Sequence, residues 1–142
     1  MTEEQLTIGE LAHRTGVATS ALRYWERLGL IASPVRVSGQ RRYPPSAVDL
    51  VGEILLLRDL GYLLRELRAL LASRSPGAAD WRELHQLKLT ELDRRIAQAQ
   101  TARTAIAHAL ACPHEDIRMC PNYASVVAAR LAGSSLAEAH PH

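Results

Sequence analysis

The chain has 142 residues and a formal net charge of +2, enough for one compact domain or a small domain with an appendage. It lacks phenylalanine and is rich in Leu, Ile, Val and Ala, which favours helices over a large sheet. No apolar run approaches the roughly 20 residues that span a membrane, and the acidic N-terminus lacks the apolar core of a signal peptide, so we expect a cytoplasmic protein.

The N-terminal stretch predicts two short helices joined by a glycine-bearing turn. Thr7 and Glu10 form a capping box that opens the first helix, and this helix ends at Gly16. The second helix runs from about Thr19 to Leu28 and is closed by Gly29. Its outward face carries polar and basic side chains: Ser20, Arg23 and Arg27. This pattern predicts a helix-turn-helix whose second helix reads the major groove, although a generic helical hairpin has the same pattern.

The next segment, residues 33–43, predicts a two-stranded wing. Val35 and Val37 alternate with polar residues, Ser38-Gly39 can turn, and the chain then returns toward Tyr43. No acid lies between Glu26 and Asp49, where four arginines fall: Arg27, Arg36, Arg41 and Arg42. Positive potential from arginine suits phosphate contact, and a solvated loop is the alternative.

Two further helices complete a predicted DNA-binding domain of residues 1–74. Ser46 and Asp49 form an N-cap pair that opens a helix to about Leu60, with Gly61 as its stop. Leucines at helical spacing then predict a helix over residues 62–71, and SRSPG at residues 73–77 is a linker.

A heptad repeat predicts a long coiled-coil helix within residues 75–111, with Asp80 as its cap. One seam position holds Leu89, Ile96, Arg103 and Leu110, and the other holds His85, Leu92, Ala99 and Ile106. His85 and Arg103 interrupt the seam, either to fix its register or because they lie at its edges. No other stretch carries a matching heptad of this length, so we expect the partner to be a second copy of the chain, which makes a homodimer.

Both cysteines lie in ACPHEDIRMCPNY, residues 111–123. Cys112 and Cys120 are each followed by proline, and His114 lies between them. In a reducing compartment such a pair is more typical of metal ligands or redox thiols than of a structural disulfide. We predict an effector loop and short helix over residues 112–132, with the helix itself at about Asn122–Leu131. Residues 133–142 are expected to form a disordered tail.

Two segments resemble the MerR family of bacterial transcription regulators: TIGELAHRTGVATSALRYWERLGLI and GQRRYPPSAVDLVGEILLLRDLGYLLRELRALL. The resemblance implies a mainly α, winged helix-turn-helix dimer joined by an antiparallel coiled coil. Such dimers bind promoter DNA with an overlong spacer and, once the effector binds, distort it so that the RNA polymerase elements realign. The resemblance also implies DNA contacts from Ser20, Arg23, Tyr24, Arg36, Arg41, Arg42 and Tyr43. Ala18, Trp25 and Leu63 depart from the family's pattern.

The Cys-x7-Cys loop looks like that of the copper-responsive branch. This implies that the thiolates of Cys112 and Cys120 bind one monovalent ion, Cu(I), Ag(I) or Au(I). Soft thiolates select soft ions, and two ligands do not satisfy Zn(II), which takes four. Divalent-sensing relatives add a cysteine from the partner's long helix, where this chain has Ala78 and no thiol. His114 could be a third ligand, which gives a trigonal Cu(I) site or, with Glu115 or Asp116, a Zn(II) or Co(II) site. The alternative is that it is a solvated loop residue.

The sequence therefore leaves three functions open. The first is a metal-sensing transcription regulator, the second is the same regulator with a disulfide-forming redox loop, and the third is a small metal carrier that does not bind DNA. An enzyme is not expected, because the chain has no readable Ser/His/Asp grouping, no Gly-rich phosphate loop and no Cys-x-x-Cys.

Overall fold

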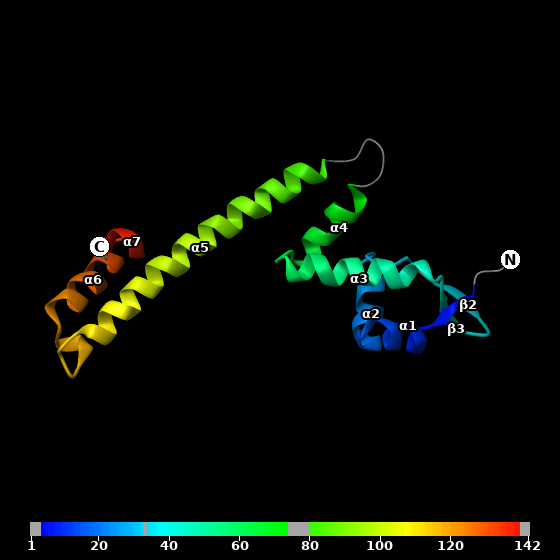
Figure 1. Ribbon diagram of the computed structural model, residues 1–142, viewed down its shortest axis with the longest axis horizontal. Helices are drawn as coiled ribbons and strands as arrows, with labels where there is room; N and C mark the ends of the chain where they lie inside the picture. The colour runs from blue at the N-terminus through cyan, green and yellow to red at the C-terminus, as the bar shows by residue number, and fades with distance from the viewer. Residues whose placement is uncertain (1–3, 33, 74–79, 140–142) are drawn as a thin grey trace. The chain divides into compact units, whose positions relative to one another are not determined.

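The computed structural model describes residues 4–32, 34–73 and 80–139, and the chain divides into two units, residues 1–88 and 89–142 (Figure 1). The elements of the first unit are β1 (Leu6–Thr7), α1 (Ile8–Thr15), α2 (Thr19–Arg27), β2 (Val35–Val37), β3 (Gln40–Tyr43), α3 (Ser46–Asp59) and α4 (Leu64–Ala72). The long helix α5 (Trp81–Ala111) begins in the first unit and continues into the second. The elements that follow it are η1 (Ile117–Met119), α6 (Pro121–Leu131) and α7 (Leu136–Ala139). The mainly α fold predicted from the sequence is confirmed.

The helix-turn-helix forms where the capping signals place it. The Thr7 hydroxyl accepts from the Glu10 N–H at 3.1 Å, and the Glu10 carboxylate accepts from the Thr7 N–H at 3.4 Å. Gly16 ends α1 with φ 73°, a left-handed conformation that suits glycine. Ala18 occupies the N-cap position of α2 and makes no side-chain hydrogen bond, so the helix begins at Thr19 without a polar cap.

The wing has one strand more than the sequence predicted. β3 pairs with β2 on one side and with β1 on the other, so the sheet order is β1-β3-β2. Leu6 lies opposite Tyr43 in the β1–β3 pair, and Arg36 lies opposite Arg41 in the β2–β3 hairpin. Ser38 and Gly39 both have positive φ, 52° and 79°, which fits the tight hairpin turn predicted there.

The N-cap pair predicted at Ser46 and Asp49 is wrong. Ser46 is the first helical residue of α3, and Pro45, which precedes it, makes no side-chain cap. At α4, Leu63 has no capping oxygen, but its N–H donates to the Glu66 carboxylate at 2.8 Å. Half of a capping box therefore compensates for the missing polar residue.

A single apolar core holds the first unit together. It joins residues of α1, α2, α3 and α4 to strands β1 and β3: Leu6, Leu11, Val17, Leu22, Trp25, Leu30, Ile31, Tyr43, Ala47, Val51, Ile54, Leu57, Tyr62, Leu67 and Leu70. Trp25, which departs from the family's pattern, is one of them and is only 3% exposed. The buried side of α2, with Leu22 and Trp25, thus holds this helix in the core and leaves its other side exposed.

A polar and aromatic cluster attaches the start of α5 to α4 within the first unit. The Lys88 ammonium is buried, lies 3.1 Å from the Glu66 carboxylate and lies 5.1 Å from the centre of the Tyr62 ring. The His85 ring packs between Tyr62 and Trp81, at centroid distances of 5.5 and 5.3 Å. Within this chain His85 therefore serves this cluster rather than an open heptad seam.

The second unit carries the loop between α5 and α6. α6 packs against η1 and α7. The short helix α7 replaces part of the tail that the sequence predicted to be disordered, and residues 140–142 lie outside the described residues. Within residues 89–139 no side chain is fully buried. Among the described residues, no helix is both long enough and apolar enough to cross a membrane.

Candidate metal site and DNA-binding surface

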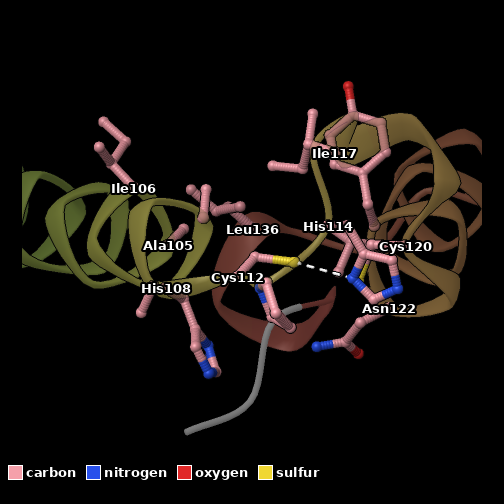
Figure 2. A pocket seen from close by; sticks show the side chains of 14 residues that line it. Ala105, Ile106, His108, Cys112, His114, Ile117, Cys120, Asn122 and Leu136 are labelled. Atoms are coloured by element: carbon pink, nitrogen blue, oxygen red, sulfur yellow. Dashed lines mark hydrogen bonds between the residues drawn. The ribbon is translucent and has the colours of Figure 1, made fainter.

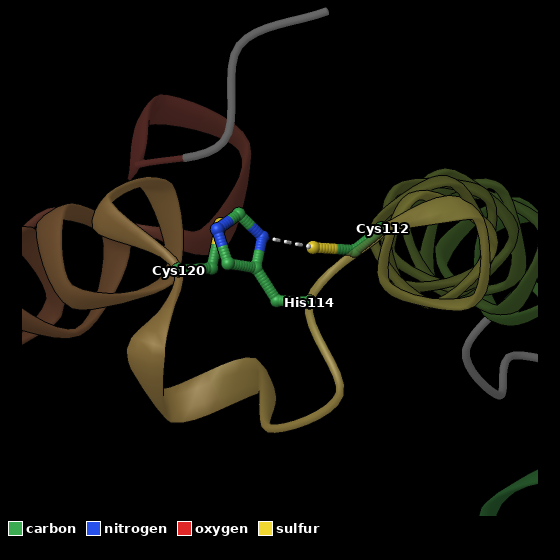
Figure 3. A group of neighbouring side chains, drawn as sticks. All are labelled: Cys112, His114 and Cys120. Carbon is green, nitrogen blue, oxygen red and sulfur yellow. Dashed lines mark hydrogen bonds between the residues drawn. The ribbon is translucent and has the colours of Figure 1, made fainter.

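Three side chains that can bind a metal converge where α5 ends. Cys112 follows the last residue of α5, Cys120 precedes the first residue of α6, and His114 lies in the loop between them (Figure 3). Their ligand atoms all lie within 4.8 Å of one another, and Cys112 Sγ is 3.2 Å from His114 Nδ1. Both thiols are free. The structure thus brings together the three residues that the sequence named.

Proline and a local ion pair shape this loop. Pro113 cannot continue α5, and Pro121 occupies the first position of α6, where its missing N–H is not needed. Between them, Asp116 accepts hydrogen bonds from the Arg118 guanidinium at 2.8 and 3.0 Å and from the Arg118 backbone N–H at 3.0 Å. The guanidinium, and after it the backbone N–H, holds the pKa of Asp116 below its usual value. Asp116 is therefore engaged with Arg118 rather than with the Cys/His cluster.

The electrostatic surroundings of Cys120 favour its thiolate. This residue sits at the N-cap of α6, where the first backbone N–H groups of a helix have no partner within the helix. The N–H groups of Tyr123 and Asn122 lower the pKa of the Cys120 thiol, and the Cys112 side chain adds to the effect. Because the thiolate is both the metal ligand and the nucleophile, Cys120 is prepared for either role.

A pocket of about 460 Å³ opens beside the cluster (Figure 2). The three candidate ligands line it together with apolar side chains from four helices: Ile106, Ile117, Val126 and Leu136. The two sulfurs thus border a mainly apolar cavity. The two cysteines are half-buried and His114 is exposed, so the cluster stays open to solvent on one side. The thiols and the apolar lining suit a soft ion better than a hydrated, hard cation.

The first unit presents a basic face formed by α2 and the wing. Ser20, Arg23, Tyr24 and Arg36 are exposed, whereas Arg41 and Arg42 are half-buried. The Arg27 guanidinium lies 5.7 Å from the centre of the Tyr24 ring. An exposed arginine-bearing helix next to an arginine-bearing hairpin is the arrangement that the resemblance implied for DNA contact.

Comparison with known proteins decides the family. Residues 6–74 match the family model described as "MerR HTH family regulatory protein", and residues 48–109 match the one described as "MerR, DNA binding". The chain belongs to the MerR family. It is accordingly a transcriptional regulator with a DNA-binding winged helix-turn-helix, and membership of this family favours that function over the metal carrier.

Individual MerR-family proteins agree with this assignment along most of the chain. The SoxR homolog of Chromobacterium violaceum, a transcriptional activator, is 35% identical over 127 residues, covering 87% of this chain and 86% of that protein. The mercuric resistance operon regulatory protein of Bacillus cereus is 34% identical over 120 residues, covering 80% of this chain and 91% of that protein. These relatives are regulators rather than enzymes.

The fold is also that of a solved transcription regulator. The crystal structure of PbrR691 from Ralstonia metallidurans, in complex with lead(II), has a TM-score of 0.69 and 21% sequence identity to this chain. The match covers 81% of this chain and 94% of that one. At this identity the likeness establishes the fold and leaves the effector to be argued from the loop of this chain.

One residue that the MerR resemblance assigned to DNA contact has another role here. Tyr43 is only 1% exposed, and its hydroxyl donates to the Glu26 carboxylate at 3.1 Å. The same carboxylate accepts from Arg41 Nε at 3.3 Å. Burial, and after it the hydrogen bond to Glu26, raises the pKa of Tyr43 to about 12. Tyr43 thus anchors the wing to α2 instead of reaching a phosphate. Glu26, which sequence reasoning missed, could have been suspected as the lone acid of α2.

The predicted dimer seam lies open in the MerR-family fold of this single chain. Leu89, Ile96, Ile106 and Leu110 are all more than half exposed. Ala99 and Arg103 are exposed as well, and Leu92 is half-buried. The heptad therefore presents an apolar stripe on α5 that is interrupted at Arg103.

Proposed function

We propose that this MerR-family regulator senses a soft monovalent metal ion, Cu(I), Ag(I) or Au(I), through the thiolates of Cys112 and Cys120. The observation that carries the proposal is the convergence of two free thiols and an imidazole within 4.8 Å in the loop between α5 and α6. The lowered pKa of Cys120 supplies a thiolate where a cation would bind. A relative of 34% identity is named for mercuric resistance, which supports a soft metal as the effector.

The surroundings of the cluster favour a monovalent ion over Zn(II) or Co(II). A structural zinc site takes four ligands. Asp116 is bound to Arg118, and among the described residues no further Cys, His, Asp or Glu joins Cys112, His114 and Cys120. A soft ion that accepts fewer ligands fits this donor set better.

On the output side, we propose that the regulator activates transcription by distorting its promoter. A homodimer formed along α5 would place two copies of the basic face on one duplex. The residues proposed to contact the phosphates and groove are Ser20, Arg23, Tyr24, Arg36, Arg41 and Arg42. Metal binding would then realign the promoter elements for RNA polymerase. The protein would achieve this by deforming the DNA and not by making new contacts with bases.

Titration of the reduced dimer with Cu(I) against a competing chelator tests the sensing step. We expect one tightly bound ion per loop and its loss in Cys112→Ser and in Cys120→Ser. Met119→Leu is the matched control, because it removes the exposed thioether of the same loop and leaves both thiols. Affinity weaker than micromolar in the wild type, or full binding by the cysteine variants, would contradict the proposal.

A thiol redox switch is the second candidate, and the same geometry supports it. Cys112 has an imidazole at 3.2 Å, and Cys120 has a lowered pKa. Hydrogen peroxide could oxidise both thiols to one disulfide and be reduced to two molecules of water, which take the two thiol hydrogens and the two peroxide hydrogens. Mass spectrometry after mild peroxide treatment, together with promoter output, distinguishes the redox switch from the metal sensor. The redox switch requires a Cys112–Cys120 disulfide for promoter activation, and the metal sensor does not.

A further inference from the structure

We infer that His114 is the third metal ligand of the loop and that it tunes the site toward Cu(I). The site then offers two sulfurs and one imidazole nitrogen, instead of the two sulfurs that the copper-responsive resemblance implies. The inference rests on the proposed function, because it assumes that a metal ion binds at Cys112 and Cys120.

The spacing of the three ligand atoms is the first support. Metal–sulfur bonds are about 2.3 Å long and metal–nitrogen bonds about 2.0–2.1 Å, so two ligands of one ion lie at most about 4.6 Å apart. The three atoms already lie within 4.8 Å of one another, and Cys112 Sγ and His114 Nδ1 are 3.2 Å apart. In a three-coordinate site with angles near 120° the ligand atoms lie about 3.7–4.0 Å apart, so closing this group on a single ion needs shifts of no more than about 1 Å.

The path of the loop is the second support. Pro113 ends α5 at once, and the Asp116–Arg118 contacts hold the chain reversal that leads back to α6. Figure 3 shows the result, with the His114 ring turned so that Nδ1 faces the sulfur of Cys112. His114 is exposed to solvent, and its ring nitrogen nevertheless lies within 4.8 Å of both sulfurs. His108, which lines the same pocket, does not belong to this group.

The chemistry of the donors indicates the ion. Two thiolates carry two negative charges, and a neutral imidazole adds a donor without adding charge. Imidazole suits copper as a ligand, whereas thiolates are the ligands that suit the softest ions. His114 should therefore raise the affinity for Cu(I) more than the affinity for the larger and softer Ag(I).

X-ray absorption at the copper edge, on the Cu(I)-loaded full-length protein, tests this assignment directly. We expect two sulfur scatterers and one nitrogen scatterer in the wild type, and two sulfurs alone in His114→Ala. The Cu(I) affinity of His114→Ala should fall by at least about tenfold, since even outer-shell partners of a metal contribute about 10–100-fold. The Ag(I) affinity should fall less. His108→Ala is the matched control and should retain the wild-type spectrum and both affinities.

The outcomes separate this inference from the proposed function. A wild-type spectrum without a nitrogen scatterer, or an unchanged Cu(I) affinity in His114→Ala, would overturn the role of His114 and leave cysteine-dependent sensing intact. An absence of Cu(I) binding that depends on the cysteines would overturn the proposed function, and the inference with it. The wild-type spectrum decides the point even where His114→Ala folds poorly, and circular dichroism identifies that case.

Discussion

At the residue scale, Tyr43 links folding stability to pH. Its pKa is raised to about 12 in the folded protein, mainly by burial and then by Glu26, whereas a tyrosine in an unfolded chain titrates near 10. Between these values the folded state keeps the proton that the unfolded state has lost. The contribution to stability is thus complete below pH 10 and is lost as the pH rises toward 12.

We therefore expect the free energy of unfolding of Tyr43→Phe to fall less between pH 10 and 12 than that of the wild type. The wild type should lose about 1 kcal/mol between pH 10 and 11 that the variant does not lose, since one pKa unit corresponds to about 1.4 kcal/mol. Urea unfolding at pH 8, 10 and 11 measures the difference. Tyr24→Phe, at an exposed position, should follow the wild type, and an equal slope in all three proteins would refute the role of Tyr43.

A second residue-scale prediction concerns Cys120 in the reduced, metal-free protein. The helix N–H groups that lower its pKa should raise its thiolate fraction at neutral pH, so Cys120 should react with iodoacetamide below the pH at which an ordinary thiol does. Peptide mass spectrometry on Cys112→Ser across pH 6–9 measures this reaction. The same variant in urea should return to ordinary thiol behaviour. If the folded and unfolded proteins react alike, the end of α6 does not activate Cys120.

At the element scale, we expect both α2 and the wing to contact DNA phosphates, and the salt dependence of DNA binding can count these contacts for each element. Each neutralised phosphate contributes about 0.9 to the slope of log K against log salt concentration. Because each substitution removes one contact from both protomers of the proposed dimer, we expect Arg23→Ala and Arg36→Ala each to reduce the slope by about two. Tyr43→Phe should leave it unchanged. Arg94→Ala on α5, outside the proposed surface, is the matched control. An unchanged slope in both arginine variants would remove these residues from the DNA interface.

The elements that could be predicted are those encoded by near neighbours in sequence. Local contacts form the Thr7–Glu10 cap and the Ser38-Gly39 turn. The heptad repeat within one segment predicts the long helix. The third strand and the burial of Tyr43 could not be predicted, because both depend on the pairing of Leu6 with Tyr43 across the domain. At Leu6 and Tyr43, packing across the domain decides the structure, and the strand preference of the nearby residues does not.

The candidate metal site also has one part that the sequence predicts and one part that it does not. The spacing of Cys112 and Cys120 and the prolines after them placed both thiols at helix ends, which was enough to name the pair. Whether His114 approaches them depends on the backbone path through the loop. That path includes the contacts between Asp116 and Arg118, which the sequence does not distinguish from two solvated charges. The third ligand was therefore only one of two open alternatives.

At the scale of the whole molecule, the two halves of the chain differ in how they bury apolar surface. The first unit has a closed core, whereas residues 89–139 have no fully buried side chain and leave four apolar residues of α5 exposed: Leu89, Ile96, Ile106 and Leu110. Burial of apolar surface is worth about 25 cal/mol per Å², so an uncovered stripe along a helix of 31 residues is a strong drive for association. A second copy offers the matching heptad.

We expect Ile96→Asp to convert the dimer to a monomer, because it buries a carboxylate at the centre of the seam with no partner charge. Sedimentation equilibrium over a range of concentrations measures the change. Arg94→Asp, two residues away on the outer face of the heptad, should remain dimeric. The monomer should still bind Cu(I), because Cys112, His114 and Cys120 all belong to one loop of one chain. Loss of both dimer and metal in Ile96→Asp would instead place a ligand on the partner, and a dimeric Ile96→Asp would reject α5 as the interface.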